Sequence, residues 1–497
     1  MRVLLSLFAF VLLSVPAGAH PSHHRTPPPP WQAASDWPDR IATTFVDDPH
    51  TSVSVTWRTD VSVDRTRAEI ALATDDARFD LTARSSRATT RTVNLEHWSG
   101  HGGERFEVFN IGLGYVNYHE VTFEGLEPDT LYAIRVKGGD GNWSEWFQVR
   151  TAPERGPVEF IYFGDAQNSI RQHWSRLIRS AHATAPQADF YLHAGDLVHD
   201  GSRDRDWAEW FDAGDFLHAQ TPIIPVVGNH EYPRMDRRAD GSRGRSLNML
   251  WRPQFALPVV EELPEPLHET VYDVRWSEDL HVFVLNSAAG WFDEQAEWLD
   301  RKLAQTDAQW TVVTMHHPFF AQPRDRSNAD SRAREAAFLS VIERHSVDMV
   351  LVGHMHFYGR LTSGRTSRVS VGEGDAVDTV FVISAGTIAQ SDPIDADFLP
   401  RVGDGQADLD GLSADRVAEN TPLFQVIRLD GDHLEYEAFT ATGRVYDAFS
   451  LQADEGHNRL VNGDAAYGET RLFEQNTGPW APGERRPHNN WEDLRGD

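Results

Sequence analysis

Residues 349–360 read Met-Val-Leu-Val-Gly-His-Met-His-Phe-Tyr-Gly-Arg, four apolar residues followed directly by a Gly-His-x-His motif. A short apolar run with β-branched residues is typical of a strand that is covered on both faces. Two buried imidazoles at its end would be costly without partners, and imidazole is a common metal ligand. The stretch therefore predicts a buried strand that delivers His354 and His356 to a metal site.

Four further motifs of the same construction precede it along the chain. Each closes a short apolar run and adds Asp, Asn or His side chains: Gly164-Asp165, Gly195-Asp196, Gly228-Asn229-His230-Glu231 and His316-His317-Pro318. The predicted strands are residues 160–163, 190–192, 223–227, 281–285, 311–313 and 349–352. Between them lie helical stretches, such as residues 295–303, and this alternation predicts an α/β domain. Sites in such domains lie beyond the carboxyl ends of the strands, so the five motifs are expected to meet in one two-metal hydrolytic site.

The chain has 497 residues and is strongly acidic, since 46 Lys and Arg against 75 Asp and Glu give a formal net charge of −29. A protein of this charge is expected to repel DNA, RNA and anionic membranes, so we expect no nucleic-acid partner. An anionic substrate would need a local positive charge, which bound metal ions could supply. The chain has no cysteine, which excludes disulfides and a lipid anchor on cysteine.

The first 19 residues are typical of a secretory signal. They contain Arg2, an apolar run over residues 3–15, and Ala17-Gly18-Ala19 as a cleavage site. They predict a secreted or periplasmic protein that is cleaved after Ala19. The apolar run is too short to span a membrane comfortably, and we expect no membrane-spanning segment elsewhere.

The rest of the chain divides by composition into four parts. We expect a stiff Pro-rich linker over residues 20–36, an all-β domain over 37–152, an α/β domain over 155–451 and a polar tail over 452–497. The tail is expected to wrap the surface or to be partly disordered. Within the α/β domain, residues 233–270 are predicted to form a long loop over the site, and residues 390–420 a surface insertion.

The all-β prediction depends on alternation and on turn residues. Residues 53–57 alternate apolar and polar side chains, the period of a half-buried strand. Residues 118–132 resemble the penultimate strands of a fibronectin type III-like sandwich, with Tyr132 after a Leu-x-Pro-x-Thr turn. Trp57, Tyr132 and Trp146 are expected in the core or on a sheet face rather than in a binding site.

The five motifs resemble, in order, those of the calcineurin-like metallophosphoesterase superfamily. With the sandwich in front, the chain is similar to the purple acid phosphatase-like branch, and residues 353–360 follow that branch's Gly-His-x-His-x-Tyr-x-Arg closely. The similarity covers residues 38–450. It implies a four-layer α+β sandwich, two β-sheets flanked by helices, behind a fibronectin III-like domain. It also implies hydrolysis of phosphate esters at two metal ions.

The resemblance implies that Asp196 bridges the two metals. Asp165 and His356 would complete the protein ligands of the first metal, and Asn229, His316 and His354 those of the second. His230 would act as the acid or bind the phosphate, and Glu231 would orient it. His230, Asp196 and Asn229 are thus the catalytic candidates. His317 could either hydrogen-bond the site or pack beside Pro318.

The chain departs from the family pattern at the first metal. The superfamily commonly has Asp-x-His in the first motif, where this chain has Gln167, and the purple enzymes have a tyrosine at the position of His199. His199, Gln167 or water could supply the fourth ligand, and His199 is slightly favoured. Without a tyrosinate on Fe(III), the protein is expected not to be purple, and its two metals could be Fe, Zn or Mn.

These observations predict an exported, metal-dependent phosphoesterase that acts on a small phosphate ester, with a phosphomonoesterase as the first expectation. A phosphodiesterase or nucleotidase would use the same metals, because specificity sits in loops such as residues 233–270. A third possibility is an inactive binding or adhesion protein on the same fold, and a fourth is an α/β domain with coincidental motifs. The oligomeric state is left open.

Overall fold

The computed structural model describes most of the chain from Trp31 to Leu460. The described residues are 31–101, 105–110, 112–232, 234–237, 243–319, 329–363, 374, 376–384, 386, 414–454 and 457–460. The predicted signal peptide with its cleavage site, residues 20–30 of the linker and the tail beyond residue 460 lie outside them. None of the described helices is both long and apolar enough to cross a membrane.

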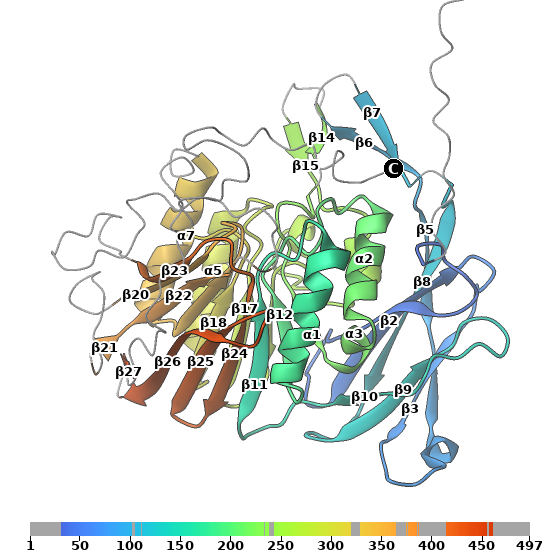
Figure 1. The fold of residues 1–497 in the computed structure, drawn as a ribbon, viewed down its shortest axis with the longest axis horizontal. Coiled ribbons are helices and arrows are strands. Elements are labelled where there is room, and N and C mark those ends of the chain that lie inside the picture. Colours follow the sequence, from blue (N-terminus) through green and yellow to red (C-terminus); the bar gives the residue numbers. More distant parts are fainter. Residues whose placement is uncertain are drawn as a thin grey trace, which may run out of the picture.

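The N-terminal part is a sandwich of two four-stranded antiparallel sheets (Figure 1). The first sheet has the order β1(Asp39–Thr44), β2(Ser52–Asp60), β8(Tyr115–Glu124), β5(Thr89–Asn94). The second has the order β10(Phe147–Arg150), β9(Leu131–Val136), β3(Arg67–Leu72), β4(Arg84–Arg87). Trp57 and Tyr132 are buried between the sheets, and Trp146 lies half-buried on a sheet face, 5.1 Å from Phe79. The expectation that these aromatic residues lie in the core or on a sheet face is confirmed.

The rest of the described chain forms two mixed sheets with helices. The eight-stranded sheet has the order β13(Ile223–Pro225), β12(Phe190–His193), β11(Val158–Phe163), β24(Leu423–Asp430), β25(His433–Thr440), β26(Val445–Asp454), β27(His457–Leu460), β21(Ala376–Val377). The seven-stranded sheet has the order β16(Tyr272–Arg275), β17(Leu280–Val284), β18(Trp310–Thr314), β19(Met349–Val352), β22(Thr379–Ile383), β20(Tyr358–Ser363), β23(Ala414–Ala418).

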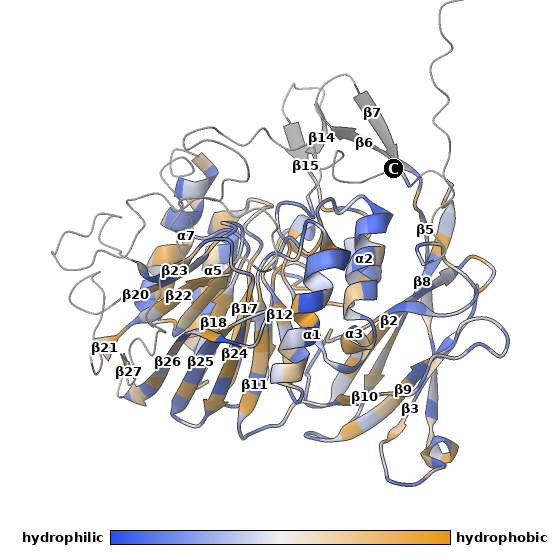
Figure 2. Ribbon diagram, viewed as in Figure 1, coloured by the Kyte–Doolittle hydropathy of each residue, from blue (hydrophilic) through white to orange (hydrophobic). Residues whose placement is uncertain are grey.

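Helices cover both sheets, which confirms the predicted two-sheet α+β architecture. The π-helix η2(Ile170–Trp174), α1(Ser175–Thr184), α2(Asp204–Gly214) and α3(Phe216–Gln220) lie between the eight-stranded sheet and the sandwich in Figure 1. The helices α5(Phe292–Gln305) and α7(Ala329–His345) pack beside the seven-stranded sheet. In Figure 2 the strands of both sheets carry much of the apolar colouring, as expected for sheets that face each other and their helices. The remaining elements are short: η1(Phe79–Thr82), β6(His97–His101), β7(Arg105–Phe109), β14(Arg234–Arg237), β15(Arg243–Arg245), α4(Trp251–Gln254) and η3(Glu265–Leu267).

The six predicted apolar runs are all strands, and they are parallel within each sheet. In the first sheet β11 pairs with β12 and β12 with β13, and in the second β17, β18, β19 and β22 pair in that order. Parallel strands that are buried on both faces consist of nearly continuous apolar residues, which is why these strands could be predicted from the sequence. Their carboxyl ends therefore share one edge of each sheet, and the motifs follow there.

Three connecting segments are in part more structured than expected, and residues 390–413 of the predicted surface insertion lie outside the described residues. Much of 233–270 is packed rather than looped over the site: Trp251, Phe255 and Leu267 are buried. Residues 414–418, within the predicted surface insertion, form β23. Residues 452–460, assigned to the polar tail, end β26 and form β27. In each case a few buried apolar residues lie among Pro, Asp, Asn and Gly. The average composition of the segment is therefore polar and did not indicate packed structure.

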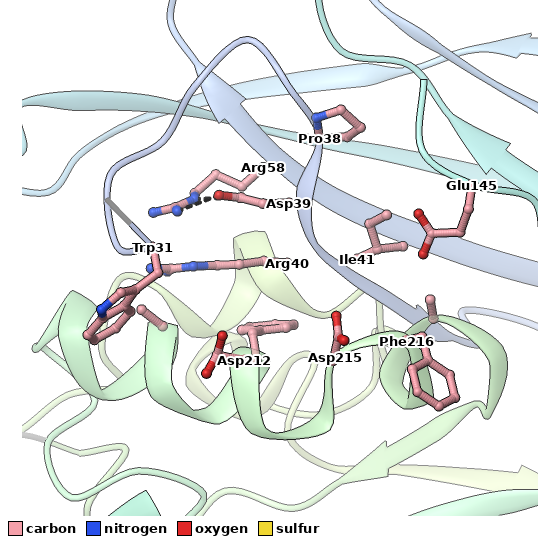
Figure 3. Close-up of a pocket in the computed structure, with 13 residues that line it drawn as sticks. Trp31, Pro38, Asp39, Arg40, Ile41, Arg58, Glu145, Asp212, Asp215 and Phe216 are labelled. Carbon is pink, nitrogen blue, oxygen red and sulfur yellow. Dashed lines mark hydrogen bonds and ion pairs between the residues drawn. The ribbon is translucent and has the colours of Figure 1, made fainter. Parts of the chain in front are cut away.

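A buried ion pair joins the sandwich to the helices. Arg40 donates from Nη1 to Asp204 Oδ1 (2.7 Å) and from Nη2 to Asp204 Oδ2 (2.9 Å). Figure 3 shows Arg40 and Arg58 at a cavity of about 250 Å³ between β1 and α2, with Trp31 at its border. Gln32 also reaches Asp204, at 3.4 Å, so the end of the predicted linker packs here instead of extending freely.

Candidate metal centre

The motifs at the strand ends adopt backbone conformations that are uncommon for residues other than glycine. Asp196 has a φ of 49°, His354 of 73° and His356 of 51°. Non-glycine residues in this region are strained by of the order of 1 kcal/mol or more and are enriched at functional sites. The strain turns these three side chains sharply away from the ends of β12 and β19 and toward the gap between the two sheets.

Glycines permit two close approaches at this point, one between neighbouring strand ends of the eight-stranded sheet and one between the two sheets. A Cβ on Gly228 would lie 2.1 Å from Asp196 Oδ1, and a Cβ on Gly353 would lie 2.3 Å from Asp165 Oδ1. Both separations are far below a van der Waals contact, and the obstructing atoms belong to buried carboxylates. The glycines that open the third and fifth motifs are therefore required for the close approach.

Asp196 lies between two groups of candidate ligands. Its Oδ2 atom is 3.0 Å from Gln167 Nε2 on one side and 3.1 Å from His316 Nε2 on the other. All three side chains are buried. One carboxylate oxygen thus faces both halves of the site, which is the geometry that a bridging ligand needs.

The first group surrounds Asp165, which is fully buried at the end of β11. Its Oδ1 accepts a hydrogen bond from the backbone N–H of His354 (2.8 Å), and its Oδ2 is 3.5 Å from His356 Nε2. Gln167 Nε2 lies 3.3 Å from the same His356 nitrogen. Asp165, Gln167 and His356 therefore converge on one point beside Asp196.

The second group centres on His316, at the end of β18. Its Nδ1 donates to the carbonyl oxygen of Ala194 (2.9 Å), which turns Nε2 toward the site. Nε2 lies 3.1 Å from Asn229 Oδ1 and 3.2 Å from His354 Nδ1. The structure thus brings together all six predicted ligands, and their roles as ligands stay predictions.

The two candidates for the fourth ligand of the first metal lie in different places. Gln167 touches Asp196 and His356, as described above. The ring of His199 instead lies against that of His230, with 5.1 Å between the ring centroids. Gln167 thus contacts the candidate bridging residue Asp196, and which of the two side chains binds the first metal stays a prediction.

Glu231 does not hold the ring of His230, contrary to expectation. Its carboxylate accepts hydrogen bonds from the backbone N–H groups of Asp196 (3.0 Å), Leu197 (3.0 Å) and Gly228 (2.7 Å). It thereby fixes the turn that carries Asp196. The ring of His230 is oriented through its Nδ1, which hydrogen-bonds the carbonyl oxygen of His199.

His317 belongs to the site rather than only packing beside Pro318. Its Nδ1 lies 2.9 Å from Ser287 Oγ, its backbone N–H donates to the same oxygen (2.9 Å), and its ring centroid is 4.3 Å from that of His354. The sequence analysis missed Ser287. The signal was present, because Asn286-Ser287 closes the run 281–285 just as the other motifs close theirs.

The titration behaviour of the site reflects two buried carboxylates that lie close together. Burial raises the pKa of Asp165 to about 8, helped by the negative charge of Asp196 and opposed by His316. Although burial by itself lowers it, the pKa of His316 rises to about 9 because Asp196 and Asp165 attract its proton. Burial and the charge of His316 hold the pKa of His354 well below its usual range, so His354 is neutral. Without metal, protons on His316 and Asp165 offset the buried negative charge.

The residues present fit a pair of metal ions. Asp165 Oδ2 and Gln167 Oε1 are buried and have no hydrogen-bond partner among the described residues. Ligand atoms of Asp165, Asp196 and His316 all lie within 4.8 Å of one another, and so do those of His316, His317 and His354. A buried acceptor without a donor is costly, and a cation would satisfy both oxygens. Carboxylate, amide and imidazole ligands suit Fe, Zn and Mn alike.

Comparisons with known proteins agree with this arrangement. Residues 38–151 match the family model described as "Purple acid Phosphatase, N-terminal domain", and residues 159–358 match the one described as "Calcineurin-like phosphoesterase". The phosphoenolpyruvate phosphatase of Allium cepa is 25% identical over 401 residues, which cover 79% of this chain and 74% of that protein. Purple acid phosphatase 21 of Arabidopsis thaliana is 27% identical over 248 residues, 49% of this chain and 53% of that protein. The alignments thus span only about half the length of several relatives.

Two solved structures share the fold. The purple acid phosphatase PPD1 from yellow lupin superposes with a TM-score of 0.63 at 16% identity, over 84% of this chain and 75% of that one. The structure of PhoD superposes with a TM-score of 0.60 at 14% identity, over 88% and 94%. At these identities the likeness concerns the fold alone.

Proposed function

We propose that this chain, a member of the calcineurin-like phosphoesterases with the N-terminal domain of the purple acid phosphatases, is a phosphomonoesterase that uses two metal ions. The observation that carries the proposal is the position of Asp196. Its Oδ2 lies within 3.1 Å of a member of each ligand group. Asp165 Oδ2 and Gln167 Oε1 are buried without a hydrogen-bond partner among the described residues, and a cation could bind them. An inactive relative would have no reason to keep this set intact.

The protein's part in the reaction is to place charges. Two metal ions bound here would supply a hydroxide at neutral pH and offset the charge of the phosphoryl oxygens. Asp196 would set the spacing of the ions, and Glu231 holds Asp196 in place through the backbone of its turn. Asn229, whose Oδ1 lies 3.1 Å from His316 Nε2, would bind an ion through this oxygen.

His230 is placed to act on the substrate. Its side chain is 29% exposed, and its Nε2 lies 3.8 Å from Asp196 Oδ2, so this nitrogen faces the centre of the site. The carbonyl of His199 accepts from Nδ1, which fixes the orientation of the ring. When its Nε2 also carries a proton, His230 would donate a hydrogen bond to a phosphoryl oxygen or a proton to the leaving oxygen.

Two further facts support a monoester as the substrate. The name of the Allium cepa relative, phosphoenolpyruvate phosphatase, gives a phosphate monoester as that protein's substrate. The names of the Arabidopsis thaliana relatives likewise describe phosphatases. Asp165 and Asp196 are the two anionic side chains among the candidate ligands, so two bound metal ions would keep a net positive charge. The dianionic phosphoryl group of a monoester would balance that charge.

The test is turnover by purified protein reconstituted with Zn²⁺, Mn²⁺ or Fe. Phenyl phosphate and a diphenyl phosphate diester would be compared at equal concentration, with Asn229→Ala as the blank. We expect the monoester to be hydrolysed faster. Faster turnover of the diester would favour a phosphodiesterase, and no turnover above the blank would refute an enzyme of either kind.

We also propose that the protein is exported to the periplasm or the medium. The support is the signal-like sequence over residues 1–19. Expression with this segment should yield a mature protein that begins at His20, as read by mass spectrometry of the extracytoplasmic fraction. Retention of the full-length chain in the cytoplasm would contradict export.

A further inference from the structure

Arg334 is a buried cation that the metal centre described above does not use. It lies in α7 and is only 7% exposed. Nη1 donates to the carbonyl oxygen of Ser287 and Nη2 to Ser331 Oγ, each at 3.5 Å, the outer limit of a hydrogen bond. Nε is buried without a hydrogen-bond partner among the described residues. Its guanidinium also lies 5.9 Å from the ring centroid of Phe292, so among the described residues its contacts are long.

Other buried arginines of this chain are held quite differently. Arg40 contacts Asp204 at 2.7 Å, Arg58 contacts Asp39 at 2.7 Å, and Arg360 contacts Asp447 at 2.8 Å. Each thus has a carboxylate within hydrogen-bonding distance, as a buried guanidinium normally requires. Arg334 has no such ion pair among the described residues.

The charge of Arg334 is only partly compensated. Burial lowers the pKa of Arg334 to about 10, and Asp330, one turn earlier in α7, opposes this effect. The side chain still carries its proton at neutral pH. Burial of a charged guanidinium that makes only long hydrogen bonds lowers the free energy of unfolding, and a bound anion would offset this loss.

Arg334 is linked to the metal centre through Ser287 and His317. Ser287, whose carbonyl it contacts, holds His317 through Oγ at 2.9 Å, and the ring of His317 lies 4.3 Å from that of His354. The positive charge of Arg334 also contributes to the low pKa of His354. Ser287, His317 and His354 follow β17, β18 and β19, so Arg334 stands at the sheet edge where ligands of α/β folds bind.

We propose that Arg334, with His317, forms a second anion-binding position beside the metal centre, which recognises a carboxylate carried by the phosphate-ester substrate. A guanidinium fork matches a planar carboxylate with two parallel hydrogen bonds. In a chain with a net charge of −29, such a substrate gains nothing from the overall field and depends on local cations. The inference builds on the proposed phosphatase function and adds the class of substrate.

The test uses pairs of substrates that differ only in charge. The pairs are carboxymethyl phosphate with carbamoylmethyl phosphate, and 3-carboxyphenyl phosphate with 3-carbamoylphenyl phosphate. Phosphate release gives kcat/KM for each. The acid should be preferred by the metal-loaded wild type in at least one pair. Arg334→Gln should reduce that preference about 10- to 100-fold, the range for a lost charge-assisted bond, and Arg334→Lys should reduce it less.

Arg332→Gln is the matched control, because it removes the same charge from an exposed position of the same helix and should leave the preference unchanged. Metal content and melting temperature of Arg334→Gln, compared with wild type, show whether the variant folds and binds metal, and its kcat/KM for unsubstituted phenyl phosphate is the reference against which the loss on the acid is read. An acid-to-amide ratio near one in the wild type, or an equal loss on both members of a pair, would overturn this inference alone. Absence of phenyl phosphate turnover by the wild type would instead overturn the proposed function together with this inference.

Discussion

Loading metal into the metal-free protein should release protons, and the structure gives their number. His316 and Asp165 can bind a cation only after they lose their protons, and their pKa values are about 9 and about 8. At pH 7 both groups are mostly protonated, so filling the site should release about one to two protons per chain. At pH 9.5, above both pKa values, the release should be much smaller.

The sign of the linked stability change follows from the same two groups. Both pKa values are raised on folding, so the folded metal-free chain binds protons that the unfolded chain lacks. From about pH 4 to 8 for Asp165, and from about pH 6.5 to 9 for His316, the stability of the metal-free protein should therefore fall as pH rises, by about 1.4 kcal/mol per pH unit for each fully displaced proton. Bound metal should gain affinity over the same interval and offset this loss.

The assay is a titration with Zn²⁺ in weakly buffered solution, with base added to hold the pH constant. Asp196→Asn is the control, since without its carboxylate the site should neither bind two ions nor release protons. Release of less than about half a proton at pH 7 would refute the reasoning. It would mean that His316 and Asp165 are already deprotonated in the metal-free protein, so that protons do not stand in for the metals.

Three other outcomes are expected. Gln167→Ala should weaken the binding of one of the two metals by about tenfold or more, whereas His199→Ala should leave both occupancies unchanged at limiting metal; the reverse result would identify His199 as the ligand. Gly353→Ala should lower the melting temperature and the metal content together, because its Cβ would lie 2.3 Å from Asp165 Oδ1, and normal values of both would show that the two sheets can separate at no cost. The iron-loaded protein should show no strong visible charge-transfer band in its absorption spectrum, because no tyrosine occupies the position of His199; a purple colour would reveal a tyrosinate from elsewhere in the chain.

The strand ends of the site were predictable because their signals are local. Strands buried on both faces need continuous apolar runs, and the polar residue that follows such a run must sit at the sheet edge. Asp165, Asp196 and His316 could therefore be placed in one site before any contact was known. Asn286-Ser287 carried the same signal and was overlooked because serine is a weak indicator of a metal site.

The differences from expectation concern side chains whose neighbours are set by the backbone path. Glu231 lies next to His230 in sequence, yet it holds the turn at Asp196, because the two loops face each other across parallel strands. His199 follows Asp196 by three residues, but the turn that begins with a φ of 49° carries its ring to His230. Spacing along the chain could not reveal either partner.

The sequence by itself determined the alternation of strands and helices and the motifs at the strand ends, since these are properties of short segments. The two-sheet architecture, the ligand sets and phosphate-ester hydrolysis were implied by the resemblance to a known family. Only the tertiary structure decided that Gln167 contacts Asp196, what Glu231 supports, and that Arg334 is buried with no ion pair to a carboxylate among the described residues. These are contacts between segments that are distant in sequence or separated by a turn. They depend on where two packed sheets bring their edges together, and that position is fixed by the whole core rather than by any one segment.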